Sequence, residues 1–175
     1  MERPPTQILG LRIIGKRCSG WGYYTAHIFV HPNAKAEVSI KRFWSVYTPQ
    51  PGDILPTLDI EEDYDNRCEL PVQKRIDQIE KMIQLVSTTI GGHKPIIYTK
   101  ARVWRELGDP AQFSDCPLWV VDCRSIGEPI LPQPWSKFSF WQYAQNLHGN
   151  GVSGTYDSNY FNGTEEDLRS QFLQI

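Results

Sequence analysis

The feature of this sequence that most constrains its fold is an alternation between short apolar runs and longer segments with helical periodicity. Pro95–Thr99 and Pro117–Asp122 are apolar over nearly their whole length. Between such runs, one apolar stripe repeats at spacings of four and three residues, formed by Val72, Ile76, Ile79, Ile83, Val86 and Ile90. Strands that helices cover on both faces have continuous apolar runs of this kind. The pattern therefore predicts an α/β protein with a mostly parallel sheet.

The same reasoning, applied along the whole chain, places seven strands and four helices. Strands are predicted at 11–14, 22–30, 54–60, 95–99, 117–122, 138–143 and 152–157. Helices are predicted after the cap residue Asn33, from Pro71 to Ile90, from Ala101 to Leu107, and after a capping box at Thr164. Because no glycine-rich phosphate loop follows any strand, the expected architecture is an irregular TIM-like β/α barrel.

Length and charge exclude several classes of protein. The chain has 175 residues, enough for one domain with a sizeable core. Its net charge of -2 gives no basic field for nucleic acid or an anionic membrane. It has no run of 18 apolar residues that would predict a membrane-spanning helix. Met1 to Arg17 lack a signal-peptide pattern, which leaves open where the protein acts.

The cysteines and acidic residues indicate no metal centre. Cys18, Cys68, Cys116 and Cys123 form no C-x-x-C pair and have no histidine at zinc spacing. Buried free thiols are expected, with a Cys116–Cys123 bridge as the alternative. The acidic stretch 59–66 fails as a calcium loop, because Tyr64 stands where the turn glycine belongs.

Asp59 and Glu61 are the best candidates for chemistry. They lie two residues apart at the end of a predicted strand, so both carboxylates point to the same face. In a β/α barrel, that end of the strands holds the active site. Two close carboxylates do not ionise independently, which leaves the acid and the anion that glycoside hydrolysis requires. Surface strand ends and helix caps also produce such pairs, so the spacing alone is weak evidence.

Other candidate residues have a structural and a functional interpretation. Asp157 follows another strand and is equally a turn residue. Glu62, Asp63 and Asp65 form a solvated acidic loop or contact substrate. Aromatic side chains on or beside predicted strands either pack in the core or stack on sugar rings: Tyr24, Tyr98, Trp119, Trp141 and Tyr143. No role is assigned to the four histidines.

Five motifs in order carry a resemblance to a known family. They are Pro51–Glu61, Lys94–Thr99, Pro117–Trp119, Phe140–Tyr143 and Asp157–Gly163. Together they resemble the family-25 glycoside hydrolases, the lysozymes (N-acetylmuramidases) that cut bacterial peptidoglycan. The resemblance covers residues 22 to 173.

The resemblance implies a barrel with its groove at the strand C-termini and no metal or organic cofactor. It implies hydrolysis of the β-1,4 bond between N-acetylmuramic acid and N-acetylglucosamine in peptidoglycan glycan strands. Glu61 would be the general acid, and Asp59 would assist the substrate's 2-acetamido group. Asp157 would be a further carboxylate, while Tyr24, Tyr98, Trp119 and Trp141 would line the sugar subsites.

The N-terminus departs from the family pattern. Family members begin with a strand that carries a G-x-D-V-S-like motif, whereas the first Asp here is Asp53. We therefore expect a divergent segment at 1–21, a lysozyme-like domain at 22–175, and a barrel whose N-terminal strand is missing or replaced. An exposed barrel edge would recruit Met1–Ile14 or another copy of the chain, unless a distortion of the barrel closes the gap. Besides an active enzyme, a catalytically impaired peptidoglycan-binding pseudoenzyme and a purely structural α/β domain stay open.

Overall fold

The computed structural model describes residues 11–14, 25–61, 70–149 and 152–172. Its strands are β1 (Leu11–Ile14), β2 (Thr25–Phe29), β3 (Thr57–Ile60), β4 (Ile96–Thr99), β5 (Leu118–Val121), β6 (Phe140–Gly149) and β7 (Val152–Phe161). Its helices are α1 (Ala36–Val46), α2 (Val72–Thr89), α3 (Ala101–Glu106) and α4 (Glu165–Phe172), with a short 3-10 turn at Ala111–Phe113.

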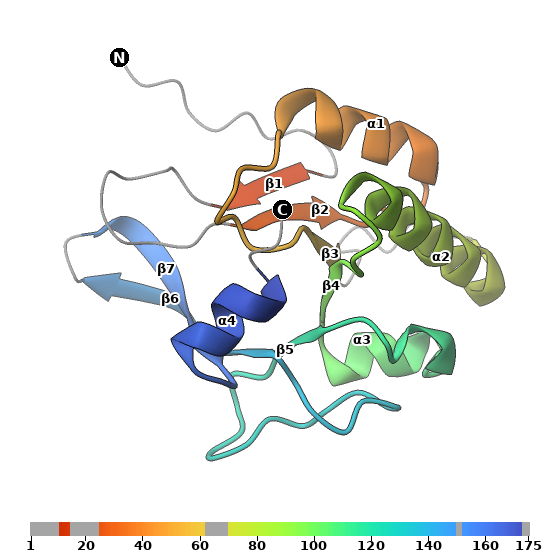
Figure 1. Cartoon of the computed structure of the whole chain (residues 1–175). Coiled ribbons are helices and arrows are strands. Elements are labelled where there is room, and N and C mark those ends of the chain that lie inside the picture. Colours follow the sequence, from red (N-terminus) through yellow and green to blue (C-terminus); the bar gives the residue numbers. More distant parts are fainter. Residues whose placement is uncertain (1–10, 15–24, 62–69, 150–151, 173–175) are drawn as a thin grey trace.

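The strands form one seven-stranded sheet whose spatial order follows the sequence, from β1 to β7. Strands β2 to β6 are parallel, and both edge pairs, β1 with β2 and β6 with β7, are antiparallel. The sheet curls, with α1, α2 and α3 on its outer side (Figure 1). Within the described residues β1 and β7 do not pair. The fold is therefore a mixed α/β half-barrel, a coarser result than the predicted TIM-like barrel.

Strand register divides the central sheet into two faces of different chemistry. Ile28, Leu58, Ile97 and Leu118 are neighbours across four parallel strands and are almost completely buried. They belong to one hydrophobic core with the buried sides of α1 and α2. The next row, one residue further along, runs through Phe29, Asp59, Tyr98, Trp119 and Phe140. The inner face thus carries polar and aromatic side chains.

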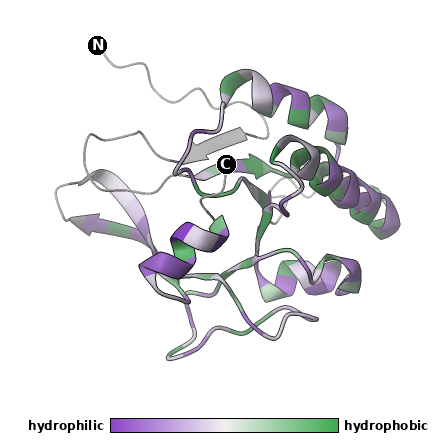
Figure 2. Ribbon diagram, viewed as in Figure 1, coloured by the Kyte–Doolittle hydropathy of each residue, from purple (hydrophilic) through white to green (hydrophobic). Residues whose placement is uncertain are grey.

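The predicted apolar stripe of α2 is confirmed along most of its length. Five of its six residues are buried: Ile76, Ile79, Ile83, Val86 and Ile90. Val72 is 42% exposed, because it lies in the first turn of α2, where fewer neighbours surround it. The hydrophilic sides of α1 and α2 face outward (Figure 2). Gly91 and Gly92 end the helix at φ values of 67° and 89°, a conformation that glycine adopts without steric cost.

Two predicted element starts are wrong. Lys35, and not Asn33, is the N-cap of α1, because Asn33 lies in a turn where its backbone N–H donates to His31 Nδ1 at 3.2 Å. Strand β3 begins at Thr57 rather than at residue 54. The strand does not begin earlier because Pro56 has no backbone N–H to donate to a neighbouring strand. The Pro56 carbonyl still accepts the Ile96 N–H at 3.0 Å.

The hairpin of β6 and β7 is longer than predicted. Each strand has 10 residues, and their pairing contains register shifts after Gln142, Ala144 and Leu147. Such irregularities interrupt the alternation of side chains that marks a strand in the sequence. The polar stretch after Tyr143 consequently carries no strand pattern, although it is part of β6.

The capping box at the start of α4 is confirmed. Thr164 Oγ1 accepts the Asp167 N–H at 3.1 Å, and the Asp167 carboxylate accepts the Thr164 N–H at 2.9 Å. These hydrogen bonds lower the pKa of Asp167. Phe172, on the buried side of α4, packs against the rings of Phe140 and Phe161 at centroid distances of 5.2 and 5.7 Å. The helix is thereby attached to the β6–β7 end of the sheet.

The cysteines that the structure describes are free thiols. Cys116 is buried and Cys123 is exposed, so the alternative of a bridge between them is wrong. Only Cys116 matches the expected buried thiol, since Cys123 lies at the surface beyond β5. Cys18 and Cys68 lie outside the described residues. In the described part of the chain, no helix combines the length and apolarity needed to cross a membrane.

Candidate active site

Asp59 and Glu61 lie at the C-terminal end of β3, on the inner face of the sheet. Asp59 is within the strand and is only 2% exposed, whereas Glu61 follows its last residue and has a side-chain exposure of 12%. Burial of a carboxylate is costly unless charges or hydrogen bonds compensate it. The surroundings of each carboxylate therefore determine what it can do.

Asp59 lies beside a buried histidine. The Nδ1 atom of His27 is 3.8 Å from Asp59 Oδ2, and both side chains are 2% exposed. The His27 ring meets the rings of Tyr98 and Trp119 edge-on, at centroid distances of 5.3 and 5.2 Å. Among the described residues, neither ring nitrogen of His27 nor Asp59 Oδ1 has a hydrogen-bond partner. Asp59 Oδ1 is thus a buried acceptor that no described residue uses.

Tyr98 is the neighbour of Asp59 in register on the adjacent strand. Its hydroxyl donates to Gln142 Oε1 at 2.9 Å, and both side chains are buried. Burial raises the pKa of Tyr98, and the charges of Glu61, Asp59 and Asp157 raise that pKa further. The Tyr98 phenol therefore stays a protonated donor at neutral pH.

Glu61 forms an ion pair with a lysine from the neighbouring strand end. Lys100 follows β4 directly, and its Nζ atom is 3.3 Å from Glu61 Oε1. Lys100 is 27% exposed, so the pair is only partly screened by solvent.

Trp119 extends the inner face toward β7. Its Nε1 donates to Asn159 Oδ1 at 2.9 Å, and its ring lies 5.8 Å from that of Tyr98 in an edge-on arrangement. Asp157 lies two residues before Asn159, is exposed, and accepts the Asn146 N–H at 3.0 Å. Asp157 thus lies on the exposed side of the hairpin, two residues from the hydrogen-bond partner of Trp119.

Several predicted site residues lie elsewhere. Trp141 pairs in register with Val120, the neighbour of Trp119, and its Nε1 donates to the Asp122 carbonyl at 2.8 Å. Its ring contacts that of Tyr143, which is 46% exposed. The structure does not bring these two into the cluster around Tyr98, and their role in sugar binding stays a prediction. Tyr24 and the acidic residues 62, 63 and 65 lie outside the described residues.

Four residues of this cluster are not among the predicted site residues: His27, Lys100, Gln142 and Asn159. Lys100 follows β4 as Glu61 follows β3, and adjacent parallel strands bring such positions together. Asn159 lies two residues from Asp157 on one strand. His27 and Gln142 give no comparable signal, because their partners are distant in the sequence. In the described part of the chain, no group of three or more His, Cys, Asp or Glu side chains could hold a metal ion.

Comparison with known proteins identifies the family. The model of the glycosyl hydrolases family 25 matches residues 18–152. The chain therefore belongs to family 25 of the glycoside hydrolases, and its mixed α/β half-barrel is consistent with that family. This confirms the resemblance that the five ordered motifs indicated.

Individual relatives share the fold over most of this chain. The muramidase of Acremonium alcalophilum superposes with a TM-score of 0.70 at 25% identity, covering 83% of this chain and 70% of that chain. The bacterial lysozyme of Streptomyces coelicolor gives a TM-score of 0.74 at 23% identity, covering 84% and 70%. The uncharacterized protein YegX of Escherichia coli O157:H7 is 30% identical over 148 residues, 83% of this chain and 50% of YegX. The chain spans about half the length of the curated relatives it matches.

Proposed function

We propose that this protein hydrolyses the β-1,4 bond between N-acetylmuramic acid and N-acetylglucosamine in bacterial peptidoglycan, through a domain formed by residues 22–175. The observation that carries the proposal is the pair Asp59 and Glu61 at the end of β3, with Asp59 in register with Tyr98 and Glu61 paired with Lys100, in a member of glycosyl hydrolases family 25. Glycoside hydrolysis needs a proton donor for the leaving oxygen and a second group that stabilises the developing positive charge. Glu61, the more accessible of the β3 pair, is proposed as the donor.

Asp59 is proposed to assist the substrate's own 2-acetamido group. Its Oδ1 accepts no hydrogen bond from any described residue, so it can accept the acetamido N–H. That hydrogen bond would orient the acetamido oxygen for attack on the anomeric carbon. Asp59 would then act by position and charge, without forming a bond to the sugar.

The aromatic side chains of the inner face support a sugar substrate. Tyr98 and Trp119 lie edge-on to each other beside Asp59, and both keep small exposed fractions of 7% and 9%. Their polar atoms are already bonded to Gln142 and Asn159, which fixes the ring orientations. Rigid aromatic walls of this kind suit the apolar faces of pyranose rings.

The cleaved bond is identified from the new reducing ends. Purified peptidoglycan is digested, reduced with borohydride and hydrolysed, and the reduced amino sugars are separated. Muramidase action predicts that reduced N-acetylmuramic acid accumulates with time. Accumulation of reduced N-acetylglucosamine, or of neither sugar, would contradict the proposed bond.

The proposed role of Asp59 predicts the stereochemistry of the product. Attack by the acetamido group and then by water inverts the anomeric carbon twice, so the first-formed sugar keeps the β configuration. Proton NMR of a soluble glycan oligomer during early turnover measures this directly. A first-formed α anomer would end the proposal for Asp59.

One observation favours the second candidate, peptidoglycan binding without turnover. Lys100 Nζ lies 3.3 Å from Glu61 Oε1, so the proposed proton donor is already engaged in an ion pair. Lys100→Met removes this cation and separates the two functions. If the ion pair blocks catalysis, the Lys100→Met variant releases reducing ends faster than wild type does. If the wild-type chain already turns over efficiently, the candidate of binding without turnover is excluded.

A further inference from the structure

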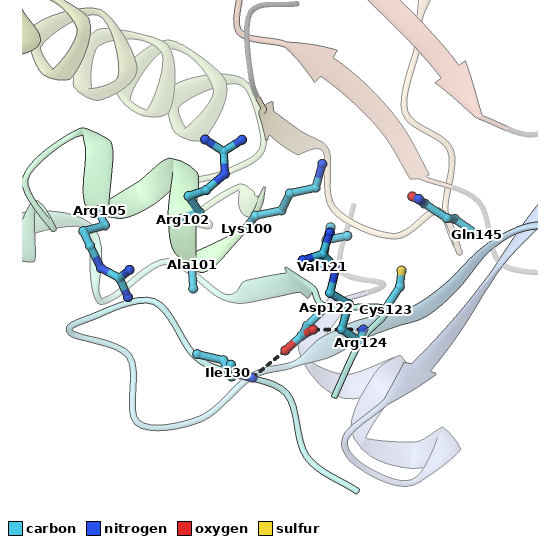
Figure 3. Close-up of a pocket in the computed structure, with 10 residues that line it drawn as sticks. All are labelled: Lys100, Ala101, Arg102, Arg105, Val121, Asp122, Cys123, Arg124, Ile130 and Gln145. Atoms are coloured by element: carbon cyan, nitrogen blue, oxygen red, sulfur yellow. Dashed lines mark hydrogen bonds between the residues drawn. The ribbon is translucent and has the colours of Figure 1, made fainter. Parts of the chain in front are cut away.

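A cavity of about 420 Å³ opens beside the candidate acid, between the start of α3 and the residues that follow β5. Figure 3 shows side chains from α3 on one side and those at the end of β5 on the other. The volume lies within the range of cavities that bind small molecules, so it accommodates a group of several atoms. Its chemistry is set by four cationic side chains: Lys100, Arg102, Arg105 and Arg124.

Two of these cations are already paired, and two are not. Lys100 pairs with Glu61, and Arg102 pairs with Glu106 one turn further along α3. Arg105 and Arg124 form no ion pair with any described residue. Each guanidinium presents a planar set of N–H donors that matches a carboxylate in two parallel hydrogen bonds.

The one carboxylate that lines the cavity is occupied by its own loop. Asp122 Oδ2 accepts the Ser125 hydroxyl at 2.6 Å and the Ile130 N–H at 2.9 Å. Its Oδ1 accepts the backbone N–H groups of Arg124 and Ser125 at 3.1 and 3.2 Å. These hydrogen bonds lower the pKa of Asp122. Asp122 therefore shapes the loop of the cavity and leaves the two guanidinium groups for another anion.

The cavity is linked to the candidate active site by one side chain. Lys100 belongs to both, because it lines the cavity and contacts Glu61. Cys123 lines the cavity too, and the charge of Asp157 contributes to its raised pKa, after the larger effect of burial. A sugar ring placed at Glu61 would therefore be separated from the cavity by the Lys100 side chain.

We propose that this cavity binds a carboxylate of the peptide that peptidoglycan carries on its muramic acid residues, with Arg105 and Arg124 as the binding cations. The inference rests on the proposed function and deepens it, because it names the part of the substrate that the cavity recognises. A muramic acid ring at Glu61 brings its lactyl-linked peptide with it. The peptide's carboxylates are then the anions that reach the cavity.

The test compares glycan strands fixed to beads: strands that keep their peptides, and the same strands after an amidase has removed the peptides and left only the lactyl carboxylates. Binding of the whole chain is measured by co-sedimentation, which does not depend on turnover. Wild type is expected to bind the peptide-bearing glycan more tightly, by at least about tenfold. The double variant Arg105→Gln/Arg124→Gln is expected to lose this preference and to bind the bare glycan as wild type does.

Arg42→Gln is the matched control, because Arg42 is exposed on α1 and away from the cavity. It should leave both affinities unchanged, and unfolding midpoints confirm that all variants fold. Equal wild-type binding to the two glycans, or binding to neither, overturns the proposal. So does competition by inorganic phosphate but not by a soluble muramyl peptide, which would assign the cavity to phosphate. Failure of the proposed hydrolysis can be told apart from failure of this proposal. A chain that binds but does not hydrolyse would show the binding preference without releasing reducing ends.

Discussion

Tyr98→Phe tests the buried hydrogen bond at the centre of the candidate site. The Tyr98 hydroxyl donates to Gln142 Oε1 at 2.9 Å, and the two side chains are 7% and 4% exposed. The variant keeps the ring but leaves a buried amide oxygen without this donor, which costs about 1–3 kcal/mol of the free energy of unfolding. A loss of about 2 kcal/mol lowers Tm by about 4–8 °C in a domain of this size. Urea unfolding followed by tryptophan fluorescence measures the difference.

A double-mutant cycle isolates the pair. Gln142→Leu removes the orphaned oxygen, so adding it to Tyr98→Phe should cost less than the sum of the two single variants. Tyr160→Phe is the matched control, because Tyr160 is 51% exposed on the same sheet and should change stability by less than about 0.5 kcal/mol. Additive single variants, or a Tyr98→Phe variant as stable as wild type, would refute the reasoning.

Two further predictions concern charged and titratable groups. Asp122→Ala removes the acceptor of four hydrogen bonds and should lower the free energy of unfolding by on the order of 2 kcal/mol. Glu128→Ala, in the same loop, is the control. Because the folded pKa of Asp122 is lowered, the stabilisation by Asp122 is lost as pH falls through that pKa. For Tyr98 the pH dependence of stability has the opposite sign. Its raised pKa means that the folded chain holds the phenol proton more tightly than the unfolded chain does. Stability should therefore fall as pH rises above about 10, and chemical denaturation of Tyr98→Phe should show a shallower fall.

Local patterns in the sequence predict the elements that carry the chemistry. The strict alternation of side chains in a strand places Asp59 and Glu61 on one face, and the spacing of apolar residues in α2 identifies its buried side. Both patterns depend only on the geometry of a single element. The capping box at Thr164 is recognisable for the same reason.

The partners of these carboxylates cannot be predicted in the same way. His27 is 32 residues from Asp59, and the Tyr98–Gln142 hydrogen bond joins positions 44 residues apart. The curl of the sheet and the register of its strands decide which polar residues of the inner face meet. The sequence pattern of a single helix or strand contains neither. The length of the β6–β7 hairpin escapes prediction because its register shifts interrupt the alternation.

The most direct test of the account is the rate at which Glu61→Gln cuts peptidoglycan. The substitution keeps the size of the side chain and removes the titratable proton, so the release of reducing ends should fall by about 10²- to 10⁴-fold. Glu80→Gln, an exposed position on α2, controls for the chemical change and should match wild type. Equal rates for wild type and Glu61→Gln, with both proteins folded, would contradict the proposal that Glu61 is the general acid.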